Sequence, residues 1–138
     1  MFYLGTFNYT LDAKGRLFIP ARFRENIGDE FVLFKSPDRC ISIYDNANFE
    51  KLVEQVQRDS NTSEGRERQR TFFSAALTVT QDKQGRFTMP QDFIDFAGLG
   101  SEVSIVGEAN RLEIWNRQTH EARNTAAVTA ADYPQIYY

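Results

Sequence analysis

Residues 11–23 read LDAKGRLFIPARF, and residues 81–93 read QDKQGRFTMPQDF. Both stretches follow one pattern: Asp-x-x-Gly-Arg, an apolar residue, any residue, an apolar residue, Pro, two further residues and Phe. Agreement at so many aligned positions indicates an internal duplication. A duplication predicts two halves related by a pseudo-two-fold axis, with a functional surface that is present twice.

Each copy of the pattern predicts a tight turn between two short strands. Alternating apolar residues over 7–11 predict a half-buried strand before the first turn. An Asp side chain can accept hydrogen bonds from the N–H groups two and three residues ahead, and Gly can adopt positive φ. We therefore expect Asp12 and Gly15 to shape the first turn, and Asp82 and Gly85 to shape the second.

The rest of each half is predicted to repeat one order of elements. Pro fits the first turn of a helix, so a short helix should follow each motif. We expect strands at 17–19, 31–34, 41–44, 75–80, 87–89, 103–106 and 112–115, and helices at 21–26, 46–57, 66–74, 91–96 and 116–124, with Asp45 or Asn46 capping the second helix.

The two halves are expected to share one core. The chain has 138 residues, close to the size of one domain, and half of it would be marginal alone. We predict an α+β fold in which both repeats build one pseudo-two-fold small β-barrel with flanking helices. The expected parts are a first repeat at 5–57, a linker and helix at 58–74, a second repeat at 75–124 and a C-terminal tail at 125–138.

Composition narrows the class of protein. Apolar residues make up 41% of the chain, which is typical of a globular domain. No apolar run approaches the roughly 20 residues that span a bilayer, and the first residues lack the apolar core of a signal peptide. A single Cys and a single His are too few for a zinc site. We expect a soluble cytoplasmic protein without a cofactor.

The arginines of the two motifs are candidate nucleic-acid contacts. Arg16 and Arg86 would project from rigid turns, and a guanidinium fork matches O6 and N7 of guanine in the major groove. A simpler alternative is that each Asp–Arg pair only braces its turn. The net charge of −3 argues mildly against general binding to polyanions, but it leaves room for a local basic patch.

The same residues carry a family resemblance. Residues 5–8 (GTFN), the tandem motifs with Pro20 and Pro90, and residues 106–115 (VG followed by RLEIW) resemble the MraZ family over roughly residues 1–120. That family consists of bacterial transcriptional regulators at the head of the division and cell-wall gene cluster. The resemblance implies swapped hairpins like those of AbrB and a ring-shaped homo-oligomer, an octamer or dodecamer. It also implies binding of double-stranded DNA at direct repeats in a promoter, and hence a nucleoid-associated protein.

Carried over to this sequence, the resemblance places DNA binding at the two Asp-x-x-x-Arg motifs. We rank Arg16 above Arg86, because basic residues follow the first motif and two acids, Asp92 and Asp95, follow the second. Lys residues in the same turns could reach phosphates. Two further arginines are added because Lys14, Arg16, Arg22 and Arg24 fall within eleven residues. The candidate DNA-binding residues are Arg16, Arg86, Lys14, Lys83, Arg22 and Arg24.

Two other functions are compatible with parts of the sequence. Asp12 and Asp82 could form a carboxylate dyad, as in aspartic proteases, but each has an Arg four residues ahead that would keep it ionised. A stripe of aromatic residues could instead serve a protein-interaction hub, although core or subunit interface is the simpler interpretation. The stripe comprises Phe31, Phe34, Phe49, Phe72 and Phe73.

Overall fold

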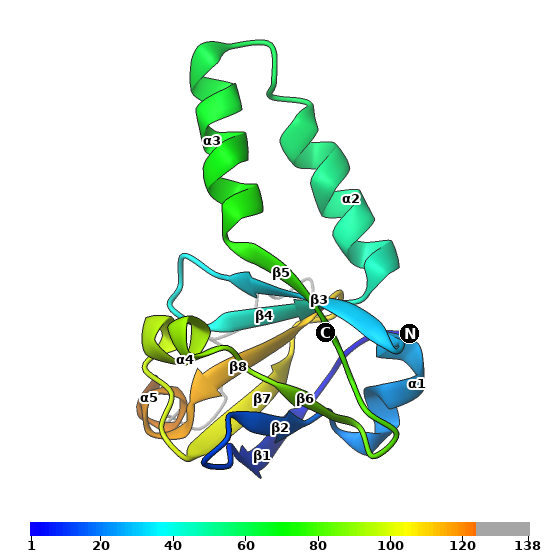
Figure 1. Ribbon diagram of the computed structural model, residues 1–138, viewed down its shortest axis with the longest axis vertical. Coiled ribbons are helices and arrows are strands. Elements are labelled where there is room, and N and C mark those ends of the chain that lie inside the picture. The colour runs from blue at the N-terminus through cyan, green and yellow to red at the C-terminus, as the bar shows by residue number, and fades with distance from the viewer. Residues whose placement is uncertain (124–138) are drawn as a thin grey trace, which may run out of the picture.

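The computed structural model (Figure 1) describes residues 1–123, so the expected tail at 125–138 lies outside the described residues. The expected order of elements is confirmed across this range. The strands are β1 (Thr6–Thr10), β2 (Arg16–Phe18), β3 (Glu30–Lys35), β4 (Ile41–Tyr44), β5 (Ala76–Thr80), β6 (Arg86–Thr88), β7 (Glu102–Gly107) and β8 (Leu112–Asn116). The helices are η1 (Ala21–Phe23, a 3-10 turn), α1 (Arg24–Ile27), α2 (Asn46–Gln57), α3 (Ser63–Ser74), α4 (Gln91–Ala97) and α5 (Arg117–Arg123).

Six strands form one antiparallel sheet whose order shows the duplication directly. The order is β1-β7-β8-β4-β3-β5. Replacing each strand with its counterpart in the other half gives the same order read from the opposite edge. The first strand of each half lies at a sheet edge, but it pairs across the molecule. β1 pairs with β7 of the second half, and β5 pairs with β3 of the first half. The halves therefore exchange strands, as expected for swapped hairpins, and neither half completes its sheet alone.

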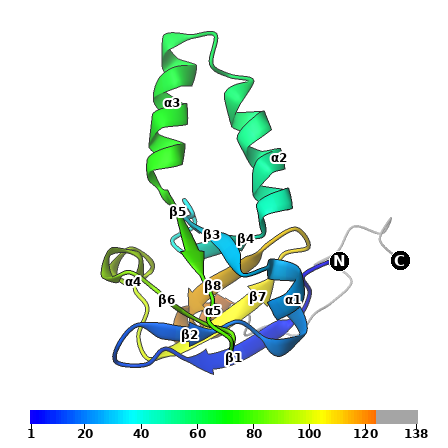
Figure 2. The same cartoon turned by 45° about the vertical axis from the view of Figure 1, so that its right-hand side comes forward.

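The two remaining strands, β2 and β6, form an antiparallel ribbon that lies across the larger sheet (Figures 1 and 2). Leu17 and Phe87 are paired in this ribbon and are buried, with 0% and 2% of their surface exposed. The Phe87 ring packs edge-on against Phe31 of β3, with centroids 5.3 Å apart. The ribbon and the sheet thus enclose a single core, which confirms an α+β fold built by both halves, although the described strands do not pair into a closed barrel.

The helices differ between the halves more than the strands do. α2 and α3 form a hairpin that stands away from the barrel (Figures 1 and 2), whereas the counterpart of α2 is the short α5. Asp45 caps α2 by accepting from Asn48 N (2.8 Å), and Asn116 occupies the equivalent place before α5, accepting from Thr119 N (3.1 Å). α3 begins three residues earlier than expected because Thr62 caps it, accepting from Gly65 N at 2.9 Å.

The aromatic stripe divides between two places. Phe31 is fully buried in the barrel core. Phe34 contacts Phe72 (4.6 Å between centroids), and Phe72 in turn contacts Phe49 (6.1 Å) and Phe73 (5.4 Å) at the base of the hairpin. These four rings are only half-buried, so most of the stripe lies outside the core.

Candidate nucleic-acid interface

The first turn is closed by the side chain and carbonyl of Asp12. Its Oδ1 accepts from the backbone N–H groups of Lys14 (2.9 Å) and Arg16 (2.8 Å). Gly15 N donates to the Asp12 carbonyl at 3.0 Å, and Gly15 has a φ of 79°. The carboxylate therefore contacts the residues two and four ahead. The expectation of two and three ahead is wrong, because the third N–H is taken by the Asp12 carbonyl.

The second turn repeats this geometry. Asp82 Oδ1 accepts from Gln84 N (2.9 Å) and Arg86 N (3.0 Å), and Gly85 N donates to the Asp82 carbonyl at 3.0 Å. Gly85 has a φ of 83°. The roles expected of the two Asp and two Gly residues in shaping the turns agree with both sets of contacts.

Each carboxylate also fixes the arginine of its own turn. Arg16 Nε donates to Asp12 Oδ2 at 2.7 Å, and Arg86 Nε donates to Asp82 Oδ2 at 3.0 Å. These hydrogen bonds use Nε, so the two terminal nitrogens of each guanidinium take no part in them. The arginine side chains remain 39% and 30% exposed. Each is thus oriented by a charge-assisted hydrogen bond while its outer edge faces solvent.

The ribbon brings the two arginines onto one face. Because side chains alternate along a strand, the buried pair Leu17 and Phe87 leaves Arg16, Phe18, Arg86 and Thr88 on the outer face. Arg16 pairs with Thr88, and Arg86 pairs with Phe18, so the arginines lie at diagonal corners. A two-residue offset along the strands and one strand spacing across them separate their Cα atoms by roughly 8 Å.

The carboxylates do not have the properties of a catalytic dyad. The backbone N–H of Arg16, followed by its side chain, lowers the pKa of Asp12 below the ordinary value. The backbone N–H of Arg86 is the main cause of a lowered pKa at Asp82. A dyad that shares one proton needs a carboxyl whose pKa is raised. These two carboxylates instead stay ionised, each beside its own arginine.

Each turn packs against residues of the other half. Gly15 lies beside α4 of the second half: Met89 N donates to Gly15 O (2.7 Å), and a Cβ at Gly15 would meet Ile94 Cδ1 at 3.6 Å. Gly85 lies beside the short helix of the first half, where a Cβ would meet the side chain of Arg24. The aligned positions Arg24 and Ile94 each contact the turn of the other copy.

This crossing overturns the reason for ranking Arg16 first. Arg24 donates through Nε to Ile19 O (2.8 Å), and its guanidinium lies 5.6 Å from the Phe18 ring centroid, beside the second turn. The acid-bearing α4 adjoins the first turn. Its Asp92 is paired with Lys35 (2.9 Å), and its Asp95 accepts from Gln91 (2.8 Å). Arg24, which follows the first motif in the sequence, therefore lies beside the second turn in space.

The other basic candidates lie in the two turns and on η1. Lys14 and Lys83 are exposed within the two turns, one on each. Arg22 is exposed on η1, with its guanidinium 5.5 Å from the Phe7 ring of β1. Sequence reasoning overlooked Phe18, which is 37% exposed between the arginines on the outer face. The period-2 pattern of β2 was the signal that could have identified it.

Cys40 is buried, and burial raises the pKa of its thiol to about 12. Among the described residues no helix is long and apolar enough to cross a membrane. Nor does this part of the chain hold a group of three or more His, Cys, Asp or Glu side chains suited to a metal ion.

Comparison with known proteins gives a consistent result. A family model described as "MraZ protein, putative antitoxin-like" matches residues 2–71 and again residues 72–128. The chain is 36% identical over 135 residues to Transcriptional regulator MraZ of Clostridium tetani, covering 97% of this chain and 93% of the relative. It is 39% identical over 120 residues to the protein of the same name from Bifidobacterium longum, covering 86% and 80%.

Proposed function

Because the chain belongs to the MraZ family, we propose that it is a sequence-specific DNA-binding transcriptional regulator and not an enzyme. It binds direct repeats in the promoter of the bacterial division and cell-wall gene cluster, as a ring-shaped homo-oligomer. It acts in the cytoplasm on the nucleoid. Relatives that cover most of the chain are named transcriptional regulators, which is a non-enzymatic role.

The observation that supports this function most strongly is the pair of arginines on the outer face of the ribbon. A two-stranded β-ribbon fits into the major groove of B-DNA, and an arginine fork there matches guanine. Arg16 and Arg86 are held by Asp12 and Asp82, so little side-chain freedom remains to be lost on binding. The exposed Lys14 and Lys83 lie at the two ends of the ribbon, where DNA phosphates would pass.

Assembly would compensate for the small charge of one copy. A single ribbon offers few phosphate contacts, and affinity from a few contacts falls steeply with salt. Several linked copies that face consecutive repeats raise the effective concentration of every contact after the first. A regular array of ribbons therefore suits direct repeats better than one isolated ribbon.

The test is the variant Arg16→Ala, assayed by gel-shift titration on duplexes that wild-type protein selects from random DNA. We expect specific binding to be abolished and assembly to be intact, because removing one arginine–guanine pair costs roughly 1–3 kcal/mol in every copy. Arg70→Ala is the matched control, since Arg70 is a surface arginine of α3 that is also paired with an acid, Glu67, at 2.9 Å. Operator affinity that is unchanged in Arg16→Ala would reject the assignment.

A further inference from the structure

The two ends of the six-stranded sheet share one backbone hydrogen bond, but the chain before it is non-helical at one end and helical at the other. At one end, residues 1–5 lie along the β7–β8 hairpin. At the other, residues 71–75 lie along the β3–β4 hairpin. An equivalent backbone hydrogen bond joins each segment to its hairpin: Gly107 N donates to Gly5 O (2.8 Å), and Lys35 N donates to Ala75 O (3.0 Å). The two ends are on opposite sides of the barrel (Figure 1).

The first end presents two apolar side chains on a fixed backbone. Tyr3 is fully buried, donates to Asp45 Oδ2 (2.5 Å) and exchanges two backbone hydrogen bonds with Ala109 (2.9 and 2.8 Å). Side chains alternate along an extended chain, so Phe2 and Leu4 point the other way. They are 75% and 58% exposed. Exposed apolar residues on an ordered segment mark an interaction site more strongly than scattered ones do.

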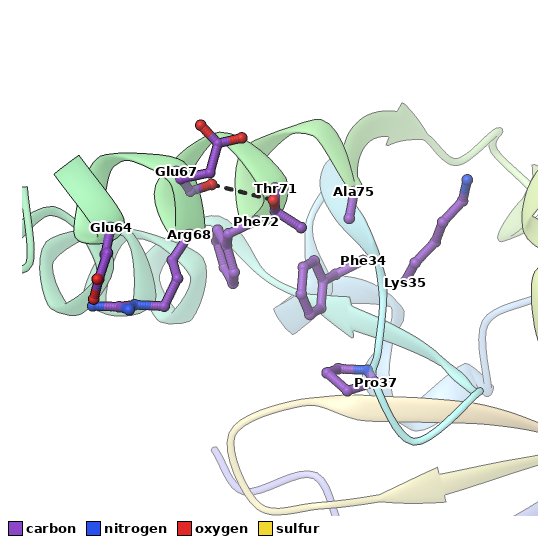
Figure 3. A pocket seen from close by; sticks show the side chains of 9 residues that line it. All are labelled: Phe34, Lys35, Pro37, Glu64, Glu67, Arg68, Thr71, Phe72 and Ala75. Carbon is purple, nitrogen blue, oxygen red and sulfur yellow. Dashed lines mark hydrogen bonds between the residues drawn. The ribbon is translucent and has the colours of Figure 1, made fainter.

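The second end presents an apolar groove. A cavity of about 520 Å³ lies between α3 and the β3–β4 turn, with Phe34, Pro37 and Phe72 around its centre (Figure 3). Within α2 and α3 only Gly65 is fully buried, so this side of the hairpin lacks a covering element among the described residues. Ala75 and Thr71 complete the apolar wall, and the charged rim consists of Lys35, Glu64, Glu67 and Arg68.

We propose that these ends fit together, so that Phe2 and Leu4 of one copy insert into the groove of the next copy. The proposal rests on the self-assembly in the proposed function, but not on DNA contact. The N-terminal segment lies on the opposite side of the molecule from α3 and the β3–β4 turn (Figure 1), and these two elements line the groove, so the segment cannot enter the groove of its own copy. Tyr3 already holds the segment in place, so docking costs little further backbone entropy.

The size of the contact is suited to an interface core. A buried aromatic side chain contributes about 150–250 Å². With Leu4 and the groove wall, Phe2 would supply several hundred Å² of apolar contact counted over both copies, a substantial part of the roughly 1,600 Å² that two partners together bury in a stable interface. Pockets that enclose ligands have volumes of ~300–1,000 Å³, so a groove of about 520 Å³ has room for two side chains.

Such a contact is heterologous, because it joins two different surfaces. Heterologous contacts generate a closed ring or an open filament, whereas a symmetric dimer needs one self-complementary surface. Every copy is then related to the next by the same operation. The β2–β6 ribbons would recur at one fixed interval, as binding to evenly spaced direct repeats requires.

The test is the mass of the full chain in solution, measured by sedimentation for variants of each end. Phe2→Asp removes the inserted side chain, and Thr71→Arg fills the groove from an exposed position of α3. We expect each to weaken assembly at least tenfold. Phe2→Leu keeps an apolar side chain, and Thr119→Arg places the same charge on exposed α5, so both controls should assemble as wild type does.

Mixing the two defective proteins gives a second readout. Phe2→Asp retains an intact groove, and Thr71→Arg retains an intact inserting segment, so a head-to-tail contact predicts one-to-one dimers and nothing larger. Assembly that survives both substitutions would overturn this interface while leaving the ring possible. Dissociation on removal of residues 125–138, with no effect of Phe2→Asp, would overturn it in favour of the tail as occupant. A monomeric wild-type protein would overturn both the interface and the proposed ring.

Discussion

The two Asp-Gly-Arg turns have nearly the same backbone but different neighbours. In both, one carboxylate accepts from the residues two and four ahead and orients an arginine through Nε. The first turn is enclosed by backbone and by Ile94 of α4, whereas the second is covered by the side chain of Arg24. Strand exchange therefore gives each turn the surroundings that the other copy encodes.

The difference shows that a pseudo-symmetric scaffold can place equivalent turns in unequal surroundings. The hydrogen bonds of the turns depend on Asp and Gly, which both copies retain. The local charge depends on positions 24 and 94, where one copy has Arg and the other has Ile. A substitution at position 24 or 94 therefore alters the surface beside the motif of the other half.

The largest expected contrast between the turns is in stability. A Cβ at Gly15 would lie 2.8 Å from the Met89 carbonyl oxygen, a backbone atom that cannot move freely. A Cβ at Gly85 would instead meet the flexible Arg24 side chain. Positive φ costs ~1–2 kcal/mol in either variant, and the backbone clash adds ~1–3 kcal/mol at Gly15. Denaturant unfolding at one protein concentration should show Gly15→Ala to be the less stable variant.

Gly100→Ala is the control for these substitutions. A Cβ there would meet nothing within 4 Å, so its free energy of unfolding should match that of wild type. Equal losses of stability in Gly15→Ala and Gly85→Ala would contradict the different enclosure of the two turns.

The sequence predicted the elements well because their signals are local. The alternating apolar residues of β1, the Asp and Gly of each turn and the cap at Asp45 act within a few residues of one another. The repeat also predicted that the halves share a core. The crossing of Arg24 and Ile94 was not predictable from sequence proximity, because strand exchange brings together residues about 60–80 positions apart. The helices α2 and α3 were predicted, but not that they form a hairpin pointing away from the sheet. They bury few side chains, so their sequence pattern does not determine an orientation.

A smaller effect should distinguish the two turns in DNA binding. Arg24→Ala removes a positive charge beside the second turn, although its sequence neighbours belong to the first motif. We expect the slope of log affinity against log salt to become shallower by about 1 for each DNA phosphate that Arg24 neutralises, with a few-fold weaker affinity for any duplex. A fluorescence-anisotropy titration at several salt concentrations measures the slope. An unchanged slope would show that Arg24 is only structural.

The most direct test of the central claim is the specificity ratio of Arg16→Lys and Arg86→Lys. Affinities for a selected operator and for an unrelated duplex of equal length are measured at one salt concentration. Lysine keeps the charge but lacks the planar fork that matches guanine. If the arginines of the ribbon read bases, affinity for the operator falls about tenfold or more, a change of roughly 1–3 kcal/mol, while affinity for unrelated DNA stays the same. Operator affinity and specificity equal to those of wild type in both variants would contradict the claim.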